Sequence, residues 1–255
     1  METLRSEAFV LGRTPLTESS WIVTLFTRDH GVVKAVAKGA RRMKSPLSGA
    51  LEPLSRVAVE VVRKEHAALG QLRTADLLEG SLDLYGRWPC AAALMAVQEV
   101  LQRGLPEGSA EEETFRLVGT VLAGMRAGAE PRLAWLYFAL WFLRLHGVLP
   151  PPHRCVACGA DPRPLHYDPG HGGWLCRTCR AGVRGTLFPL GPEAERLLAA
   201  ILRRPLAEIA PADSSRAAAA ALRPVVHSGL AAFLGRPLAA SEPLETADAD
   251  DASAD

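Results

Sequence analysis

The chain has 255 residues, of which 48% are apolar and 22% are charged, and its formal net charge is +1 at pH 7. This balance excludes an intrinsically disordered chain, and the length suits one large domain or two small ones. No run reaches the roughly 18 continuous apolar residues of a membrane span. The first nine residues, METLRSEAF, lack the basic-then-apolar pattern of a signal peptide. We therefore expect a cytoplasmic protein.

The small net charge conceals an asymmetry along the chain. Residues 238–255 contain six acidic residues and no Lys or Arg, so that 29 basic and 22 acidic residues remain in 1–237, a net charge of +7. The part expected to fold is therefore moderately basic, which favours a polyanionic partner. The tail at 238–255 is acidic and poor in large apolar residues, and we expect it to be disordered.

Residues 1–80 have the pattern of five short strands separated by turns, at about 8–13, 21–27, 31–38, 57–62 and 69–75. Five strands in such a short segment predict a small closed barrel, of which the OB-fold is the common form. OB-folds bind single strands with a cationic groove and stacking aromatic side chains. Trp21 and Phe26 are candidates for stacking, but an aromatic residue on a strand is more often part of the core, and neither is assigned to the site.

The strongest charge pattern is GVVKAVAKGARRMK at residues 31–44, and no acid falls between His30 and Leu51. In a strand, side chains alternate between faces, so Lys34 and Lys38 should share one face while Val33, Ala35 and Ala37 face a core. Gly39 then permits a turn that adds Arg41, Arg42 and Lys44 to the basic face. This pattern suits a phosphate backbone. The alternative is a solvated edge strand, since lysines also protect sheet edges.

Residues 81–237 show helical periodicity, with apolar residues such as Leu94, Val97 and Leu101 at i, i+3 and i+7. Residues 133–145 are apolar nearly all round, which predicts a helix buried inside a bundle. Helical patterns also follow at 192–202 and 214–234. The segment 153–189 between them is therefore interpreted as an insertion in one helical domain. Cys90 stands apart from the other cysteines and is expected to be a buried apolar residue.

The inserted segment carries two CxxC pairs separated by 17 residues, a spacing typical of a four-cysteine zinc site. The expected ligands are Cys155, Cys158, Cys176 and Cys179. Four thiolates fill the zinc tetrahedron and leave no open position, so a single structural zinc ion is expected. An iron–sulfur cluster and a redox dithiol are the alternatives. His153, His166 and His171 lie nearby and are interpreted as loop residues.

We find no GxxxxGK[ST] loop, no strand–GxGxxG–helix unit, no HExxH, no GxSxG and no deaminase signature. This favours a binding protein over an enzyme.

Two separated segments resemble the RecO family of bacterial DNA-repair proteins. The first comprises the runs LFTRDHG and AKGARR at residues 25–31 and 37–42. The second is the run VLP at 148–150, which leads into CVACG and GGWLCRTC, as in members that keep a four-cysteine zinc module. The resemblance implies an α+β protein with an N-terminal five-stranded OB-fold barrel at 1–80. A helical domain at 81–237, with the zinc module inserted at 153–189, would follow.

The resemblance also implies a function and partners. RecO-like proteins bind single- and double-stranded DNA, anneal complementary strands and, with RecR and in some settings RecF, help load RecA onto DNA coated by single-strand-binding protein (SSB). The family's basic residues carry over onto Lys34, Lys38, Arg41 and Arg42, with Lys44 adjacent, whereas Arg203 and Arg204 stay undecided. A zinc-ribbon transcription or RNA-binding factor is the alternative, and a zinc-dependent enzyme acting on nucleic acid is a further one.

Overall fold

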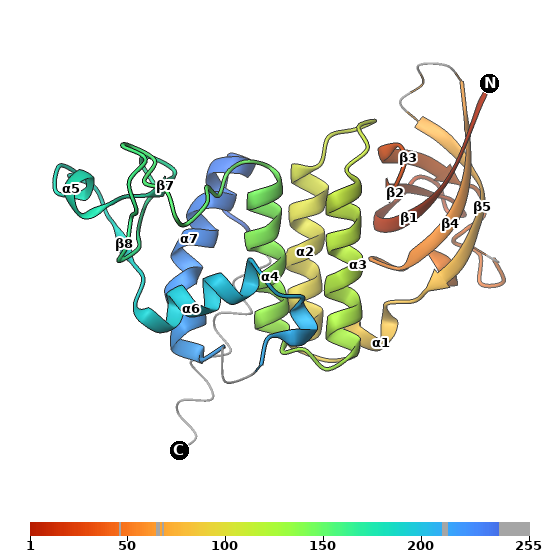
Figure 1. Ribbon diagram of the computed structural model, residues 1–255. Coiled ribbons are helices and arrows are strands. Elements are labelled where there is room, and N and C mark those ends of the chain that lie inside the picture. The colour runs from red at the N-terminus through yellow and green to blue at the C-terminus, as the bar shows by residue number, and fades with distance from the viewer. Residues whose placement is uncertain (46, 65–66, 68, 211–213, 240–255) are drawn as a thin grey trace. The chain divides into compact units, whose positions relative to one another are not determined.

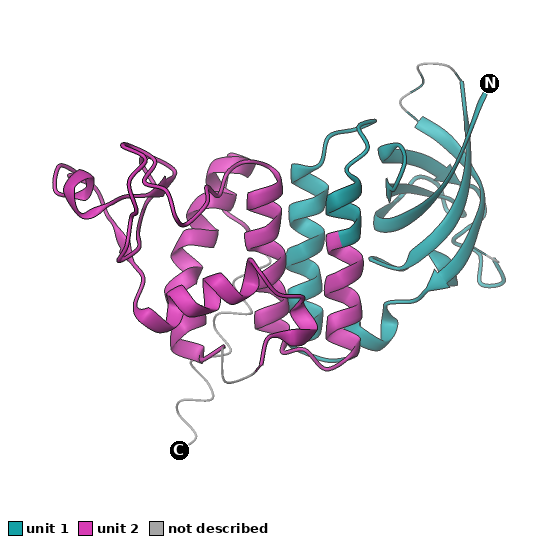
Figure 2. Ribbon diagram, in the orientation of Figure 1, with its two compact units in different colours: residues 1–116 teal, residues 117–255 magenta. Residues whose placement is uncertain are grey.

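The computed structural model describes residues 1–239 except 46, 65–66, 68 and 211–213 (Figure 1). Most of the acidic tail expected at 238–255, including all six of its acids, lies outside the described residues. The chain divides into two compact units, Met1–Arg116 and Leu117–Asp255 (Figure 2). The first unit therefore contains more than the barrel expected at 1–80, because it also holds two helices and the start of a third.

Five strands form a closed barrel in the order β1-β2-β3-β5-β4. Neighbouring strands are antiparallel except β3 and β5, which are parallel. The structure therefore confirms the predicted OB-like barrel at the N-terminus. The strands are β1 (Glu2–Pro15), β2 (Trp21–Thr27), β3 (Gly31–Ala37), β4 (Arg56–Arg63) and β5 (Leu69–Glu79).

Strand β1 closes the barrel because it pairs with two neighbours. Its first half, from Glu2 to Phe9, pairs with β4, and its second half, from Ala8 to Pro15, pairs with β2. The sequence pattern predicted only residues 8–13 of this strand. The polar run from Glu2 to Glu7 carries little apolar signal, and it becomes a strand because β4 supplies its hydrogen-bonding partners.

The barrel core is built from small and β-branched residues that face inward from every strand. Ala50 and Leu51 of the short 3-10 helix η1 (Gly49–Leu51) join this core. Other members include Val23, Leu25, Val33, Ala35, Ala37, Val57, Val59 and Val61.

Outside the barrel, the first unit contains α1 (Leu82–Tyr85) and α2 (Cys90–Gly104). The amides of Gln98 and Gln102 on α2 both donate to the Leu11 carbonyl of β1, at 2.7 and 2.5 Å.

Gly31 begins β3 at a position that only glycine fits. Its φ is +64°, and a Cβ atom there would lie 2.1 Å from the Ser109 carbonyl oxygen. The loop that follows α2 is held against β3 by a bridge between Val32 and Glu107 and by a hydrogen bond from Gly108 N to Val32 O, at 3.3 Å. The close approach at Gly31 therefore fixes this loop beside the basic strand.

The second unit is helical, with most of α3 (Glu112–Arg126) and the whole of α4 (Pro131–Leu145), α6 (Pro192–Ile201) and α7 (Arg216–Leu234). Helix α4 is buried on nearly all sides, as its composition predicts. Gly229 lets α7 approach α4 closely, since a Cβ atom there would lie 2.8 Å from Leu143 Cδ1. The 3-10 helix η2 (Leu206–Glu208) lies between α6 and α7 in the chain.

The cysteine segment lies between α4 and α6 in the chain. It contains β6 (His166–Asp168), β7 (Gly173–Trp174), α5 (Arg177–Arg180) and β8 (Phe188–Pro189), and its strands form a small sheet in the order β7-β6-β8. Tyr167 and Trp174 are fully buried and contact each other edge to face, with ring centroids 5.2 Å apart. This pair gives the segment a small core of its own.

Helix α7 is the one described helix with the length and composition to cross a membrane, with a mean hydropathy of 1.4. The same test is passed by core helices of proteins that contain no membrane span. Helix α7 contains Arg223 and Pro224 and packs against α4 and α6. We therefore assign it to the helical bundle.

Replacing Gly31 by alanine should strongly destabilise the first unit. The left-handed backbone costs a residue with a Cβ about 1–2 kcal/mol, and Ser109 would also have to move. Gly108→Ala is the matched control, because Gly108 has φ +74° but no atom lies within 4 Å of an added Cβ. Urea unfolding should show Gly31→Ala to be at least about 1 kcal/mol more destabilising than Gly108→Ala. Equal losses would show that the contact with Ser109 is unimportant.

Candidate nucleic-acid interface and metal centre

Strand β3 separates its apolar residues from its charged residues as the alternation predicts. Val33, Ala35 and Ala37 lie in the barrel core, while Lys34 and Lys38 are exposed. The closed barrel fixes this arrangement, because a shift of one residue would place both lysines in the core. Lys34 therefore lies on the outward face of β3, and Lys38 is exposed at the start of the turn that follows Ala37.

Lys34 has an acidic partner that is distant in the sequence, although residues 31–50 contain no acid. Its Nζ lies 2.6 Å from Glu107 Oε1, and both side chains are about half exposed. The loop held against β3 by Gly31 brings this carboxylate to the strand. An exposed ion pair of this kind contributes about 0–1 kcal/mol, so Lys34 can exchange Glu107 for another anion at little cost.

Gly39, with φ +71°, turns the chain after β3 and directs Arg41 back toward β2. The backbone N of Arg41 donates to Ser19 O at 3.0 Å, and its Nη1 donates to Thr17 O at 2.5 Å. Its guanidinium carbon lies 4.9 Å from the centre of the Trp21 ring. These contacts hold the guanidinium of Arg41 over an aromatic ring beside the basic strand.

Trp21 is contacted by a second arginine that the sequence pattern did not indicate. The guanidinium carbon of Arg13 lies 5.4 Å from the same ring centre, and Arg13 pairs with both carboxylate oxygens of Glu52, each at 3.0 Å. Arg13 lies on β1 among uncharged neighbours, and only the barrel register brings it near Trp21. Trp21 is half-buried, whereas Phe26 is fully buried and contacts Phe115, as expected of a core residue.

The remaining predicted cations follow in the same turn. Arg42 N donates to Gly39 O at 3.1 Å, and the side chains of Arg42 and Lys44 are exposed. The structure thus distributes the five predicted basic residues between the outward face of β3 and the turn after it: Lys34, Lys38, Arg41, Arg42 and Lys44.

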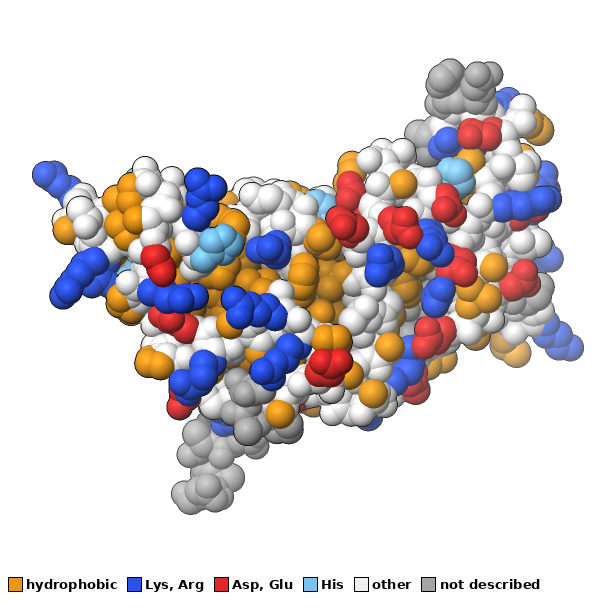
Figure 3. Space-filling model, viewed as in Figure 1, with side chains coloured by type: hydrophobic (Ala, Val, Ile, Leu, Met, Phe, Trp, Pro, Cys, Tyr) orange, Lys and Arg blue, Asp and Glu red, His pale blue; other side chains and the backbone are white. Residues whose placement is uncertain are grey.

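A second basic area lies in the helical unit. Figure 3 shows Lys and Arg side chains gathered over α6 and the cysteine segment on the face in view. A groove of about 550 Å³ in this unit is lined by Arg144, Arg163, Arg196 and Arg203, and Glu195 is the acidic residue among the described residues that line it. Of the two arginines left undecided by the sequence, Arg203 lines this groove and Arg204 does not. Arg144 and Arg196 were not indicated by any local pattern, because they come from separate helices.

The four cysteines of the CxxC pairs converge on one point, with every Sγ within 4.8 Å of the others. The Sγ atoms of Cys158 and Cys176 are 3.6 Å apart. The first pair lies in a turn closed by Gly159, whose N donates to Cys155 O at 2.8 Å, and Cys176 immediately precedes α5. Cys90, by contrast, is buried in α2 and belongs to the other unit.

The environment of these thiols favours ionisation at two of them. Burial acts to raise the pKa of Cys155, but hydrogen bonds from the backbone N–H groups of Cys176, Cys158 and Ala157 outweigh it and lower the pKa to about 6. The backbone N–H of Cys179 is the main cause of a lowered pKa at Cys176. Hydrogen bonds with the side chains of Cys158 and Cys176 raise the pKa of Cys179 to about 12. The cluster thus combines negative charge with close sulfur atoms, which suits a thiophilic cation.

Two of the three neighbouring histidines have partners other than the cysteines. His171 Nδ1 pairs with Asp168 Oδ2, and His166 contacts a guanidinium nitrogen of Arg180. Within the described residues, the candidate metal-binding group consists of the four cysteines. Because all four sulfur atoms surround one point, the arrangement is that of a closed metal site.

The fold and this site define a class of protein: an OB-like barrel followed by a helical unit that carries a four-cysteine cluster able to hold a metal ion. Two family models match the chain in this order. Residues 1–81 match the model described as "Recombination protein O N terminal", and residues 90–242 match "Recombination protein O C terminal". The chain therefore belongs to the RecO family of DNA repair proteins.

Individual relatives agree with this assignment. The chain is 39% identical over 160 residues to the DNA repair protein RecO of Koribacter versatilis, an alignment covering 62% of this chain and 64% of that protein. It is 34% identical over 226 residues to RecO of Anaeromyxobacter dehalogenans strain 2CP-C, covering 88% and 87% of the two chains. It is 31% identical over 234 residues to RecO of Rubrobacter xylanophilus, covering 89% and 91%.

Cys155→Ser should abolish metal binding at the four-cysteine cluster, because the three remaining thiols no longer enclose an ion. Elemental analysis of the purified protein should show about one metal ion per chain in the unsubstituted protein and a loss of at least tenfold in the variant. Cys90→Ser is the matched control, since it removes a thiol outside the cluster and should leave the metal content unchanged. Equal metal content in Cys155→Ser and the unsubstituted chain would contradict this assignment.

Proposed function

We propose that this protein is a RecO-type mediator of DNA repair and homologous recombination that binds single- and double-stranded DNA and anneals complementary strands. The observation that carries this proposal is the basic outward face of β3, which the turn at Gly39 extends with three further cations. Cations spaced along a strand and a turn suit a phosphate backbone, and they bind it whatever its base sequence. Family membership supports the choice of DNA repair.

Annealing by this surface requires no bond to be made or broken. Two DNA strands repel each other, and lysine and arginine side chains on the phosphates reduce that repulsion while the base edges stay free to pair. We therefore propose that the protein acts by binding and not by catalysis.

Trp21 and Arg41 extend this mechanism to the bases of a single strand. The guanidinium of Arg41 lies over the Trp21 ring, and a planar guanidinium both pairs with phosphate and stacks on an aromatic base. Base stacking on such a group tolerates any sequence, because every base has a π-face. Trp21 is therefore proposed as an addition to the five basic residues of the interface.

We propose that the four cysteines hold one structural zinc ion. Zinc–thiolate bonds of about 2.3 Å in a tetrahedron place sulfur atoms about 3.8 Å apart. The 3.6 Å distance from Cys158 to Cys176 is close to this value, and the other sulfur atoms lie within 4.8 Å of one another. When bound, zinc would cross-link the two turns of the module and so contribute to its folding.

The proposed partners follow from the family. With RecR and RecF, the protein would help load RecA onto single-stranded DNA coated by SSB, in the cytoplasm of a bacterial cell.

The proposed organisation is an OB domain at residues 1–80 and a helical domain at 81–237, with the zinc module at 153–189.

Replacing Lys34, Lys38, Arg41 and Arg42 by alanine should abolish acceleration of annealing between two complementary oligonucleotides, one quenched on pairing, with or without SSB. Each lost phosphate contact should lower the salt slope of single-strand binding by about 0.7, so that four contacts account for about 3. Arg5→Ala with Arg63→Ala is a control, because these cations lie on β1 and β4 and pair with Glu60 and Glu2.

Three outcomes of this experiment differ in meaning. Unchanged binding and salt slope in the fourfold variant would remove the proposed surface. Preserved binding without annealing in the unsubstituted protein would leave a DNA-binding scaffold in place of an annealing protein. A preference for structured RNA over DNA of equal length would favour an RNA-binding factor.

Glu107→Gln should tighten binding to single-stranded DNA. The substitution removes the carboxylate that pairs with Lys34, at 2.6 Å, and keeps a side chain of the same size. We expect up to a fewfold lower Kd at low salt and a salt slope steeper by up to about 0.7. Glu60→Gln is the control, since Glu60 pairs with Arg5 away from β3. If Lys34→Ala combined with Glu107→Gln still showed the tighter binding, Lys34 would not be its cause.

A further inference from the structure

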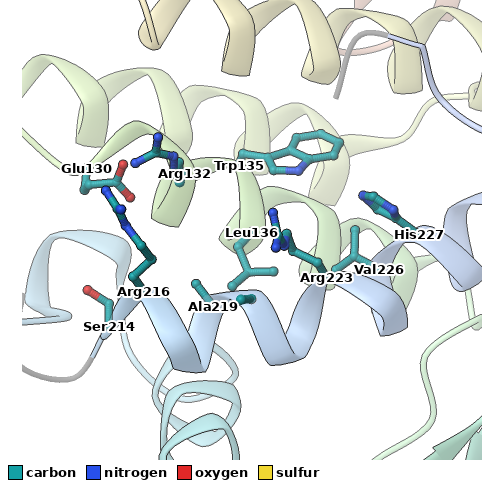
Figure 4. A pocket seen from close by; sticks show the side chains of 11 residues that line it. Glu130, Arg132, Trp135, Leu136, Ser214, Arg216, Ala219, Arg223, Val226 and His227 are labelled. Carbon is teal, nitrogen blue, oxygen red and sulfur yellow. The ribbon is translucent and has the colours of Figure 1, made fainter. Parts of the chain in front are cut away.

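Arginine side chains lie near tryptophan rings in both units, but the surroundings of the rings differ. In the helical unit, Trp135 and several arginines line a cavity of about 270 Å³ between α4 and α7 (Figure 4). The Trp135 ring is buried and stacks on Phe138, with ring centroids 6.0 Å apart. Trp141 of α4 is half-buried, and its Nε1 donates to Ile201 O at 2.8 Å. Both rings are therefore part of the packing of the helical unit.

Trp21 has a different setting in the barrel unit. It is the first residue of β2, and its ladder partners Pro15 and Ala37 are the last residues of β1 and β3. The ring is half-buried against the barrel core. Two guanidinium groups contact it, those of Arg13 at 5.4 Å and Arg41 at 4.9 Å from the ring centre. Trp21 thus lies where three strands begin or end, with a cation contributed by β1 and another by the turn after β3.

Arg13 reaches Trp21 because of an irregularity in β1. Val10 and Arg13 are three residues apart, so in a regular strand they would face opposite sides of the sheet. The pairing with β2 shifts by one residue between Val10 and Gly12. Arg13 then lies opposite Val23, which belongs to the barrel core, and opposed residues share one face of a sheet. The bulge therefore turns Arg13 toward the face on which Trp21 packs against the core.

The guanidinium of Arg13 is fixed by a carboxylate of the same unit. Its Nη1 and Nη2 donate to the two carboxylate oxygens of Glu52, each at 3.0 Å, and the side chains are only 29% and 23% exposed. Glu52 directly follows η1, whose Ala50 and Leu51 are buried in the core. A bidentate pair fixes the plane of a guanidinium as well as its position. Compared with the half-exposed Lys34, Arg13 is therefore a poor contact for phosphate and a rigid support for the ring.

We propose that Arg13, held by Glu52, is a positioning residue that fixes Trp21 and gives the DNA interface a preference for single-stranded over double-stranded DNA. A ring that is already fixed loses less conformational entropy when a base stacks on it. Bases inside a duplex are stacked on one another and do not reach the ring, so a duplex is bound through its phosphates alone. This inference rests on the proposed function, because it concerns the same interface.

A double-mutant cycle between Arg13 and Trp21 tests this role. We expect Arg13→Ala to weaken binding of a single-stranded oligonucleotide about five- to tenfold and to change binding of a duplex of equal length by less than about twofold. In a Trp21→Leu background, which keeps an apolar contact with the core but offers no aromatic face, Arg13→Ala should have no further effect. The salt slope should stay unchanged in Arg13→Ala and fall by about 0.7 in Arg41→Ala.

Three further variants separate geometry from charge. Arg5→Ala is the matched control, because Arg5 also lies on β1 and pairs with a carboxylate, that of Glu60 on β4, at 2.8 Å. It should leave the ratio of single-strand to duplex affinity unchanged. Glu52→Gln should lower this ratio as Arg13→Ala does, because the charged bidentate pair is lost. Arg13→Lys should also lower it, since an ammonium keeps the charge without the planar fork. Duplex binding in each variant reports that the barrel is folded.

A second readout needs no DNA. With 5-fluorotryptophan incorporated, the fluorine resonance of Trp21 is assigned by its loss in Trp21→Leu. It should move in Arg13→Ala and Glu52→Gln and stay in place in Arg5→Ala. An unmoved resonance in Arg13→Ala would overturn the proposal.

The outcomes of the cycle distinguish this inference from the proposed function. Equal weakening of single-strand binding by Arg13→Ala with and without Trp21 would overturn this inference alone, and so would an equal loss for single strand and duplex. Absence of DNA binding in the unsubstituted protein would overturn the proposed function and this inference together.

Discussion

The closed barrel is the constraint on which the proposed interface depends. Because β1 pairs with both β2 and β4, the register of its neighbours is fixed, and in β3 buried side chains alternate with outward-facing ones from Val33 to Ala37. Lys34 is therefore held outward by the burial of Val33 and Ala35 on either side of it, and Lys38 follows the buried Ala37 at the start of the turn. The same register places Trp21 of β2 where Arg41 and Arg13 reach its ring. A flexible basic segment would carry the same charge without this geometry.

The cysteine segment has only a small hydrophobic core to stabilise its fold. Its buried residues include the Tyr167–Trp174 pair and a small cluster of Cys155, Leu175 and Cys176. A metal ion held by four sulfur atoms would add a cross-link that a core of this size cannot supply. The closed arrangement of the sulfur atoms agrees with a structural role.

Basic residues gather in two parts of this molecule, and acidic residues lie beside them. Exposed cations gather on β3 and its following turn, and others line grooves of the helical unit. Single acidic residues lie beside these cations. Glu107 pairs with Lys34, and Glu130 lines the α4–α7 cavity together with its arginines. The acidic segment that follows α7 is the largest counter-charge in the sequence.

The sequence by itself determined the OB-like barrel, the helical segments, the four-cysteine cluster and the outward direction of Lys34 and Lys38. These features follow from local periodicity and spacing, which a linear pattern carries. Only the tertiary structure decided the full length of β1, the pairing of Lys34 with Glu107, the contact of Arg13 and Arg41 with Trp21, and the cavity between α4 and α7. Each of these joins residues far apart in the chain, and strand register and helix packing bring them together without leaving a local signal.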